Sequence, residues 1–263
     1  MTLTGFDTRD RQMFFTLLAM TIRDRFLGSQ LGRVWAILNP VMMLSIFSFV
    51  FTVVFPQRLP GSNSTYSYLI WLISGYGPWL AINEGLVSGA GSVIGSAGII
   101  KNIAFKSELL PMVGAMMGLI PLTVSFGYLI VLIVLSGASV SPAWLFLPLV
   151  AFVQIVLVSG IGLFLSGITV FVRDTLMILP NILMMILFLS PVFFPITSFP
   201  PTGQAISYFN PVFILADSYR QPILNGAAPD LWRLCYVAVL GVIVFTAGLQ
   251  FFRRLKPYFS SRL

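Results

Sequence analysis

The sequence predicts an all-α integral membrane protein with six transmembrane helices, an N-terminal interfacial helix and short re-entrant helices before the last span. Of its 263 residues, 57% are hydrophobic and 9% are charged, whereas roughly a quarter of the residues in a soluble domain are charged. Several apolar stretches exceed the roughly 20 residues that a helix needs to cross a bilayer. Because lipid offers no hydrogen-bonding partner to the backbone, such stretches are expected to be helical.

The N-terminal stretch, residues 6–30, is predicted to be a helix in the membrane interface. Its charged side chains are interleaved with Phe, Leu and Met, as is typical of interfacial helices. At 100° per residue one face collects polar side chains, namely Arg9, Gln12, Thr16 and Arg23. The first residues mix acids with bases and lack the plan of a cleaved signal peptide, so we expect the chain to begin in the cytoplasm.

Six apolar runs are then predicted to span the membrane: residues 34–55, 66–87, 110–135, 143–172, 176–194 and 231–252. The turn-forming residues Pro56 and Gly61 close the first run. Six spans return the chain to its starting side, so both termini are expected in the cytoplasm.

The distribution of Lys and Arg supports this orientation in a cell inner membrane. Of the fifteen cations, only Arg58, Arg220 and Arg233 fall in segments placed outside, which agrees with the positive-inside rule. The net charge of +7 is therefore explained by topology, without nucleic acid as a partner.

Residues 196–226, before the last run, are apolar in patches but interrupted by Pro200, Pro201, Pro211 and Pro222. A full span does not fit between these prolines. Short re-entrant helices are predicted, with backbone groups buried in protein or lining a water-filled cavity.

The chemistry expected of an enzyme is scarce in this chain. Neither Gly-Lys-Ser nor Gly-Lys-Thr occurs, so no Walker A loop is available to bind ATP. Histidine is absent and Cys235 is the only cysteine, so we predict no Cys/His metal site, no cofactor and no catalytic residues. A membrane-embedded transferase stays open as an alternative, which catalysis by the purified chain alone would reveal.

Two features of the apolar runs have a functional and a structural interpretation. Glu84 lies near the end of the second run, where a carboxylate must be paired, protonated or hydrated; it either serves transport or bonds to Asn83 or a neighbouring helix. Phe47, Phe51 and Phe55 share one helix face and either stack on sugars along a transport path or pack against lipid and other helices.

The segment 92–109 combines an apolar run with Lys101, Asn102, Lys106 and Glu108 on the predicted cytoplasmic side. The segment is predicted to be a short docking helix, since a helix with apolar anchors and a charged rim is suited to binding a partner subunit. A solvated loop that anchors the adjacent span is the alternative.

Residues 23–40, RDRFLGSQLGRVWAILNP, resemble the membrane subunits of ABC-2 type exporters, which show an Arg-rich entry, Gly-Ser-x-Leu-Gly-x-x-Trp and then the first span. The similarity continues through residues 75–111 and 171–200 and so covers nearly the whole chain. Length and motifs are most similar to the permeases that export O-antigen polysaccharide in lipopolysaccharide biosynthesis, with relatives that export capsular polysaccharide and teichoic acid. Where relatives often carry Phe-Pro in the coupling segment, this chain has Phe105 followed by Lys106.

The resemblance implies a homodimer of permeases with two ATPase subunits, which bind ATP and Mg²⁺, and a lipid-linked polysaccharide that passes between the permease copies. It further implies that a coupling segment transmits ATPase closure, through Ile99, Lys101, Asn102, Phe105, Lys106 and Glu108. The interfacial helix would gate the cytoplasmic entrance, and the re-entrant helices would cap the exit.

The anionic head of such a substrate suggests a role for Arg23, Arg25 and Arg33 at the entrance, where guanidinium groups form charge-assisted hydrogen bonds. The same arginines also suit positive-inside topology and contact with membrane lipid phosphates. Two other functions stay open: a drug or lipid as the exported substrate, and a carrier or channel that works without an ATPase.

Overall fold

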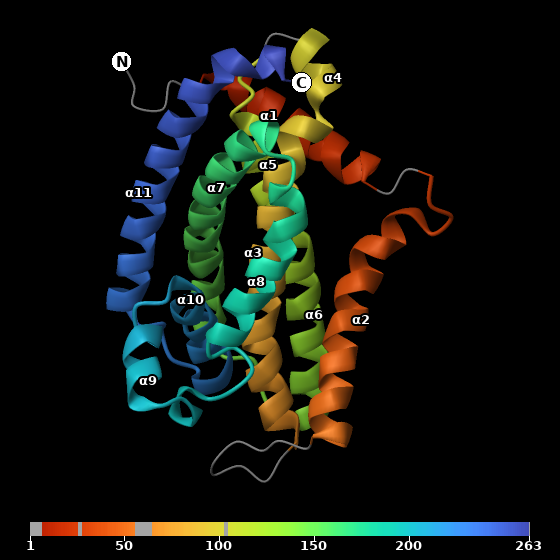
Figure 1. The fold of residues 1–263 in the computed structure, drawn as a ribbon. Coiled ribbons are helices and arrows are strands. Elements are labelled where there is room, and N and C mark those ends of the chain that lie inside the picture. Colours follow the sequence, from red (N-terminus) through yellow and green to blue (C-terminus); the bar gives the residue numbers. More distant parts are fainter. Residues whose placement is uncertain (1–6, 26–27, 56–64, 103–104, 263) are drawn as a thin grey trace.

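The computed structural model describes residues 7–25, 28–55, 65–102 and 105–262. Over these residues the chain is helical with no strand, which confirms the all-helical prediction. The predicted closing turn at Pro56 and Gly61, together with Arg58, lies outside the described residues. Figure 1 shows an elongated bundle in which α1 (Thr8–Asp24) and the last turns of α11 (Leu231–Leu255) lie at one end, here called the terminal end.

The centre of the bundle is α3 (Thr65–Gly95), which packs against α5 (Leu109–Met116), α6 (Leu119–Ser136) and α7 (Leu147–Phe171). Its inner face is fully buried at Leu72, Ile73, Ala90 and Val93. The outer helix α11 packs along α7. Burial of these apolar faces between helices, rather than a sheet or a separate domain, organises the fold.

Four segments of the described part of the chain are long and apolar enough to cross a membrane: Gly32–Val54, Leu109–Ser136, Pro142–Phe171 and Leu231–Phe259. The first joins η1 (Gly32–Val34), α2 (Trp35–Phe49) and η2 (Val50–Val54), and the third begins with η3 (Pro142–Phe146). The other two predicted spans correspond to α3, which is long but carries many Tyr, Trp, Gly and Ser residues, and to α8 (Thr175–Leu189), which has only 15 residues.

Three helix ends differ clearly from the predicted ranges. The interfacial helix predicted to reach residue 30 ends at Asp24, and the positive φ angles of Gly28 and Gly32 that follow are incompatible with a continuing helix. The helix α3 continues to Gly95, eight residues beyond 87, because Ala90 and Val93 are fully buried and tertiary packing outweighs the low helix propensity of the glycines. The segment 92–109 is therefore not one helix: it contains the end of α3, the short α4 (Ala97–Asn102) and a turn before α5. The helix α8 ends at Leu189 rather than at 194, because Ser190 precedes Pro191 and takes an extended conformation.

The end of the bundle opposite the terminal end holds short helices within residues 196–226: η4 (Ile196–Ser198), α9 (Pro201–Ser207), α10 (Pro211–Arg220) and η5 (Gln221–Asn225) (Figure 1). Proline begins α9 and α10, where its missing N–H is not needed. The Asn210 side chain caps α10 by accepting a hydrogen bond from the Val212 amide at 2.9 Å.

At the terminal end, α1 lies across the bundle and packs on α5 (Figure 1). Asp7 and Asp10 form a capping box at its start. Its buried residue Leu17 joins an apolar cluster with Leu109, Leu110 and Val113. The α1 helix is thus attached to the bundle through Leu17. After the terminal turns of α11, η6 (Lys256–Ser261) completes the described chain.

Candidate functional site

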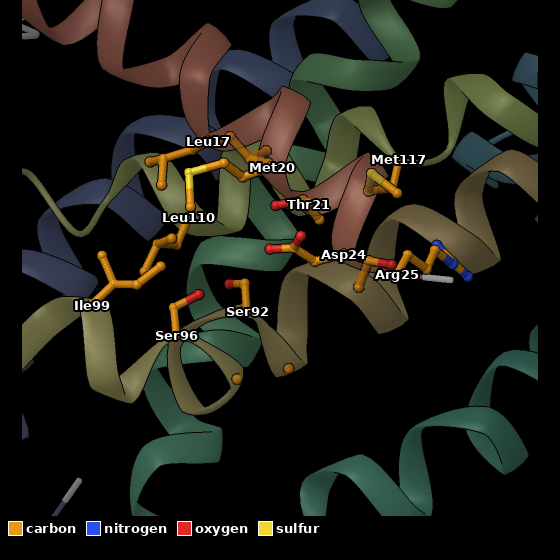
Figure 2. A pocket seen from close by; sticks show the side chains of 15 residues that line it. Leu17, Met20, Thr21, Asp24, Arg25, Ser92, Ser96, Ile99, Leu110 and Met117 are labelled. Atoms are coloured by element: carbon orange, nitrogen blue, oxygen red, sulfur yellow. The ribbon is translucent and has the colours of Figure 1, made fainter. Parts of the chain in front are cut away.

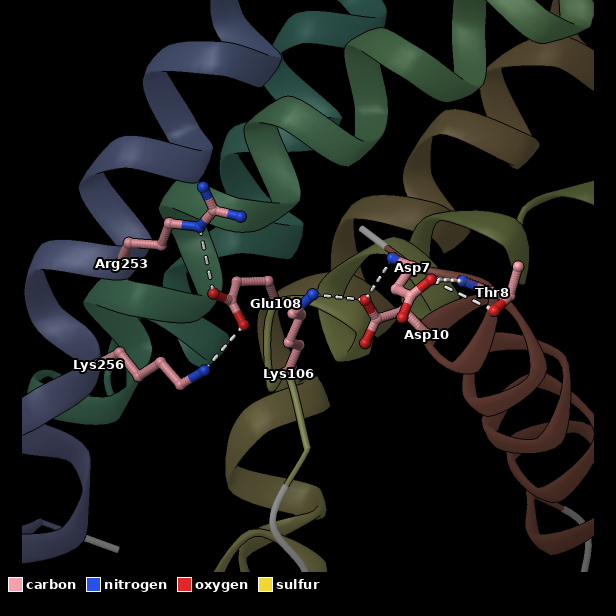
Figure 3. Close-up of polar contacts among 7 residues, drawn as sticks. All are labelled: Asp7, Thr8, Asp10, Lys106, Glu108, Arg253 and Lys256. Carbon is pink, nitrogen blue, oxygen red and sulfur yellow. Dashed lines mark hydrogen bonds and ion pairs between the residues drawn. The ribbon is translucent and has the colours of Figure 1, made fainter. Parts of the chain in front are cut away.

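Charged side chains from three elements meet at the terminal end, around a turn formed by residues 105–108 (Figure 3). Within this 105–108 turn, Glu108 has a side chain only 5% exposed. Its carboxylate accepts from Arg253 Nε at 3.3 Å and from Lys256 Nζ at 3.0 Å, both at the end of α11. Burial opposes ionisation, but hydrogen bonds from a backbone amide and Lys256 and the two positive charges outweigh it, so the pKa of Glu108 is below its ordinary value. Hydrogen bonds and ion pairs therefore hold the start of α5 against the end of α11.

The same turn also contacts α1 through Lys106, whose ammonium donates to the Asp10 carboxylate (Figure 3). Asp10 additionally accepts from the Asp7 amide at 2.8 Å as part of the capping box. The hydrogen bond from Lys106, followed by that from Asp7, holds the pKa of Asp10 below its ordinary value. The 105–108 turn thus connects the first helix of the chain to the last.

Arg25, at the end of α1, forms a bidentate ion pair with Glu84 of α3. Arg25 Nη2 donates to Glu84 Oε2 at 2.8 Å, and Nη1 donates to Oε1. Ser88 adds a third hydrogen bond to Glu84 Oε1, at 2.6 Å. Glu84 is thus bonded to a neighbouring helix, as the structural interpretation of this residue requires, although not through Asn83.

Arg25 also borders two cavities. The larger, called here the α1–α3 cavity, has a volume of about 350 Å³ and lies between α1, α3, α4 and α5 (Figure 2). Its polar side is formed by Thr21, Asp24, Arg25, Ser88, Ser92 and Ser96, and its apolar side by Leu17, Met20, Ile99, Leu110, Val113 and Met117. The smaller cavity, of about 60 Å³, reaches Glu84, Trp35 and Asn39. Such mixed walls offer a charged group and several hydroxyls next to an apolar surface.

The other predicted residues are distributed more widely. Arg23 and Arg33 are exposed, and neither lines the two cavities beside Arg25. Phe105 and Lys106 line a further cavity of about 590 Å³ against α1. Lys101 and Asn102 end α4, but their side chains lie outside the described residues.

The aromatic stripe on α2 and η2 divides into a packed part and an exposed part. The Phe47 ring lies 4.6 Å from Tyr76 and 4.9 Å from Phe193, centroid to centroid. Phe51 lies 5.9 Å from Phe193, whereas Phe55 is 62% exposed. Phe47 and Phe51 therefore stabilise the contact of the first span with the bundle, and Phe55 alone of the three faces outward.

A buried arginine at the opposite end was not recognised as special from the sequence. Arg220 of α10 is 5% exposed and donates to the carbonyls of Pro191 at 3.1 Å, Val192 at 2.6 Å and Trp71 at 3.3 Å. Its guanidinium carbon lies 3.9 Å from the centroid of the Trp71 ring. In the sequence, Arg220 is a cation at the end of an apolar segment bounded by prolines. The positive-inside rule places this segment outside but does not indicate that the arginine is buried.

Membrane-length apolar helices, charges gathered at one end and a buried cation at the other define a polytopic membrane protein. Among the described residues no group of His, Cys, Asp and Glu is placed to hold a metal ion. The sequence profile of the ABC-2 type transporter family matches residues 12–224, and the chain belongs to this family.

Similarity to individual proteins extends over nearly the full length. The chain is 26% identical over 258 residues to an O-antigen export system permease protein RfbA of Klebsiella pneumoniae, covering 95% of this chain and 96% of that protein. It is 23% identical to RfbA of Myxococcus xanthus, with 96% of each chain covered. The polysialic acid transport protein KpsM of Escherichia coli is 24% identical, with 90% of this chain and 91% of that protein covered.

Proposed function

We propose that this chain is the transmembrane permease subunit of an ATP-driven exporter that moves a lipid-linked polysaccharide from the cytoplasm across the inner membrane. The observation that carries the proposal is the similarity, over 95% of the chain, to permeases of O-antigen export. O-antigen is therefore the first candidate substrate. The similarity to a polysialic acid transport protein makes a capsular polysaccharide the second, ahead of teichoic acid, a drug or a lipid.

The engine of transport would be a separate ATPase subunit, since the sequence contains no Walker A loop. Two permease copies with two ATPase subunits form the proposed assembly, in which the ATPase binds ATP and Mg²⁺. The exposed apolar faces of α2 and α8, which include Ile37, Phe49, Met177 and Phe188, are suited to lipid or to a second copy. The polysaccharide would pass between the two copies.

The proposed topology places the terminal end in the cytoplasm, with both termini inside and six spans. The positive-inside rule supports this orientation, since Lys106, Arg253, Arg254 and Lys256 lie at that end. In this topology α3 and α8 are the remaining two spans. The 31 residues of α3 extend about 46 Å at 1.5 Å per residue, enough to cross the hydrocarbon core. The helices α9 and α10 would enter the membrane from outside and return.

The proposed entrance for the substrate head group is the region around Arg25, assisted by Arg23 and Arg33. A diphosphate carries charge that a guanidinium binds in a bidentate manner, and Arg25 already holds a carboxylate in that manner. A phosphate group that replaces Glu84 as the partner of Arg25 would also lie beside the hydroxyls of the α1–α3 cavity, which are suited to sugar hydroxyl groups. Glu84 would then set the affinity of Arg25 for the phosphate, because its carboxylate competes for the same guanidinium.

The direct test uses inside-out membrane vesicles that contain the chain and its ATPase subunit, loaded from outside with lipid-linked glycan. Export is measured as ATP-dependent protection of the glycan from an added glycosidase. Vesicles with an ATPase subunit mutated in its Walker A lysine provide the control. Protection of an O-antigen glycan by active vesicles supports the proposal; protection without ATP, or of a drug but of no glycan, contradicts it.

A further inference from the structure

We propose that the ion pair between Lys106 and Asp10 makes α1 move together with the 105–108 turn, so that ATPase closure acts directly on the entrance. Lys106 and Asp10 are positioning residues for transport in this proposal, which rests on the proposed function. Closure of the ATPase subunits then reaches α1 at its first turn, through the ion pair between Lys106 and Asp10.

The 105–108 turn has two opposite charges two residues apart, and each points to a different helix (Figure 3). Glu108 is buried and bonded to Arg253 of α11 and to Lys256, which follows α11 directly, so this side of the turn is firmly attached. Lys106 reaches the opposite way, to Asp10, with a side chain that is 35% exposed. When a partner subunit presses on the turn, the bonds of Glu108 hold the turn to α11, and the ion pair of Lys106 transmits the movement to α1.

Because α1 is attached at both ends and near its middle, a movement at its first turn is transmitted to its last turn. At its first turn, Asp10 is paired with Lys106 of the 105–108 turn. Near its middle, Leu17 packs in the apolar cluster with α5, and at its end Arg25 is paired with Glu84. At 1.5 Å per residue, Leu17 lies about 10 Å from Asp10 and about 12 Å from Arg25 along the helix. Because a helix of this length is stiff, a displacement at Asp10 that pivots at Leu17 reaches Arg25 with similar size and opposite direction.

Space for this movement exists beside the ion pair. Phe105 and Lys106 face α1 across the cavity of about 590 Å³ that Asp10, Met13 and Thr16 also line. At the far end of α1, Arg25 lines the α1–α3 cavity. Tilting α1 therefore changes the Arg25–Glu84 pair and the cavity walls without requiring a change in the central packing of α3 against α7.

The experiment measures α1 movement and ATPase coupling in the complete permease–ATPase complex in lipid nanodiscs. A fluorophore at Arg11→Cys, an exposed position on α1 next to Asp10 and about 9 Å from Leu17 along the helix, reports movement in a Cys235→Ser background when ATP is trapped by a hydrolysis-deficient ATPase subunit. Stimulation of ATPase activity by lipid-linked glycan is measured in the corresponding active complex. The variants are Lys106→Met, Lys106→Arg and Asp10→Asn, the last of which keeps an oxygen to accept the Asp7 amide of the capping box.

We expect Lys106→Met and Asp10→Asn each to reduce the ATP-dependent signal and the glycan stimulation about fivefold or more, while Lys106→Arg retains both. The double variant should be no worse than either single one, because residues that act as a pair are not additive. Arg233→Gln, which breaks a partly exposed ion pair with Asp230 at the other end of α11, is the matched control and should change neither readout.

Three results would overturn the inference: additive effects, an unchanged fluorophore signal in both single variants, or loss of ATPase subunits from the Lys106→Met complex, which would make Lys106 a docking residue. Failure of the proposed function is distinguishable, because the unmodified complex would then fail to assemble or show no response to glycan.

Discussion

Replacing Arg220 by Met should destabilise the protein by about 2–4 kcal/mol. The guanidinium donates to three carbonyls. The Trp71 carbonyl keeps a second donor, Ser74 Oγ at 2.9 Å, so only the carbonyls of Pro191 and Val192 would lose their hydrogen-bond donor in the variant. Leaving a buried acceptor without its donor costs about 1–3 kcal/mol, and loss of the contact with the Trp71 ring adds to it. The removed cost of burying a guanidinium offsets part of the sum.

The assay is thermal unfolding of the purified protein in detergent, where about 2–4 kcal/mol corresponds to a fall in Tm of roughly 10 °C on the scale of soluble proteins of similar size. Arg233→Met is the control, because this arginine is partly exposed and forms only an ion pair with Asp230 and a contact with the Tyr208 ring, whose loss should change stability by about 1 kcal/mol. Equal Tm values for the two variants would refute the structural role assigned to Arg220.

A second substitution tests the same contact from the other side. A Cβ atom at Gly75 would lie 2.3 Å from Arg220 Nη2, so Gly75→Ala should push the guanidinium away from its carbonyls and lower the Tm in the same direction. The size should be smaller than for Arg220→Met, because the guanidinium is the far end of a flexible side chain.

Further predictions concern the terminal end and the helix packing. Glu108→Gln should destabilise the protein by about 1–2 kcal/mol, since the carboxylate is buried but its partners are partly solvated. Because the pKa of Glu108 is lowered on folding, its stabilisation is fully present above its ordinary pKa and disappears as pH falls through the folded value; Glu108→Gln should remove this loss from Tm measurements between pH 6 and about pH 3. Gly114→Ala should lower the Tm by forcing a Cβ to 2.5 Å from Gly89 Cα, whereas Gly127→Ala, which meets no atom within 4 Å, should leave it unchanged or raise it. Glu84→Gln should shift glycan stimulation of the ATPase to lower glycan concentrations, since a neutral amide competes less with phosphate for the cation; an unchanged concentration dependence would contradict the role proposed for Glu84.

The sequence was sufficient for the helical class because composition and apolar run length are local properties. The end of α8 was also accessible, since the Ser190–Pro191 step disfavours helix. The extension of α3 to Gly95 was not, because it depends on burial of Ala90 and Val93 by other helices. Local propensity carries no information about such packing.

The candidate site shows the same division. Arg25 and Glu84 were each selected from the sequence, but their ion pair joins positions 59 residues apart and needed the fold. Glu108 was selected as a coupling residue, whereas its partner Arg253 lies 145 residues away. Arg220 was assigned to an outside loop, because positive-inside counting weighs charges by segment and does not reveal burial.

The most direct test of the proposed export function is co-purification of the chain with its ATPase subunit, followed by ATPase assays in lipid nanodiscs with and without lipid-linked glycan. We expect a complex of two permease and two ATPase subunits whose ATPase activity rises when the glycan is added. A chain that purifies without any ATPase subunit, or a complex whose activity ignores the glycan, would contradict it.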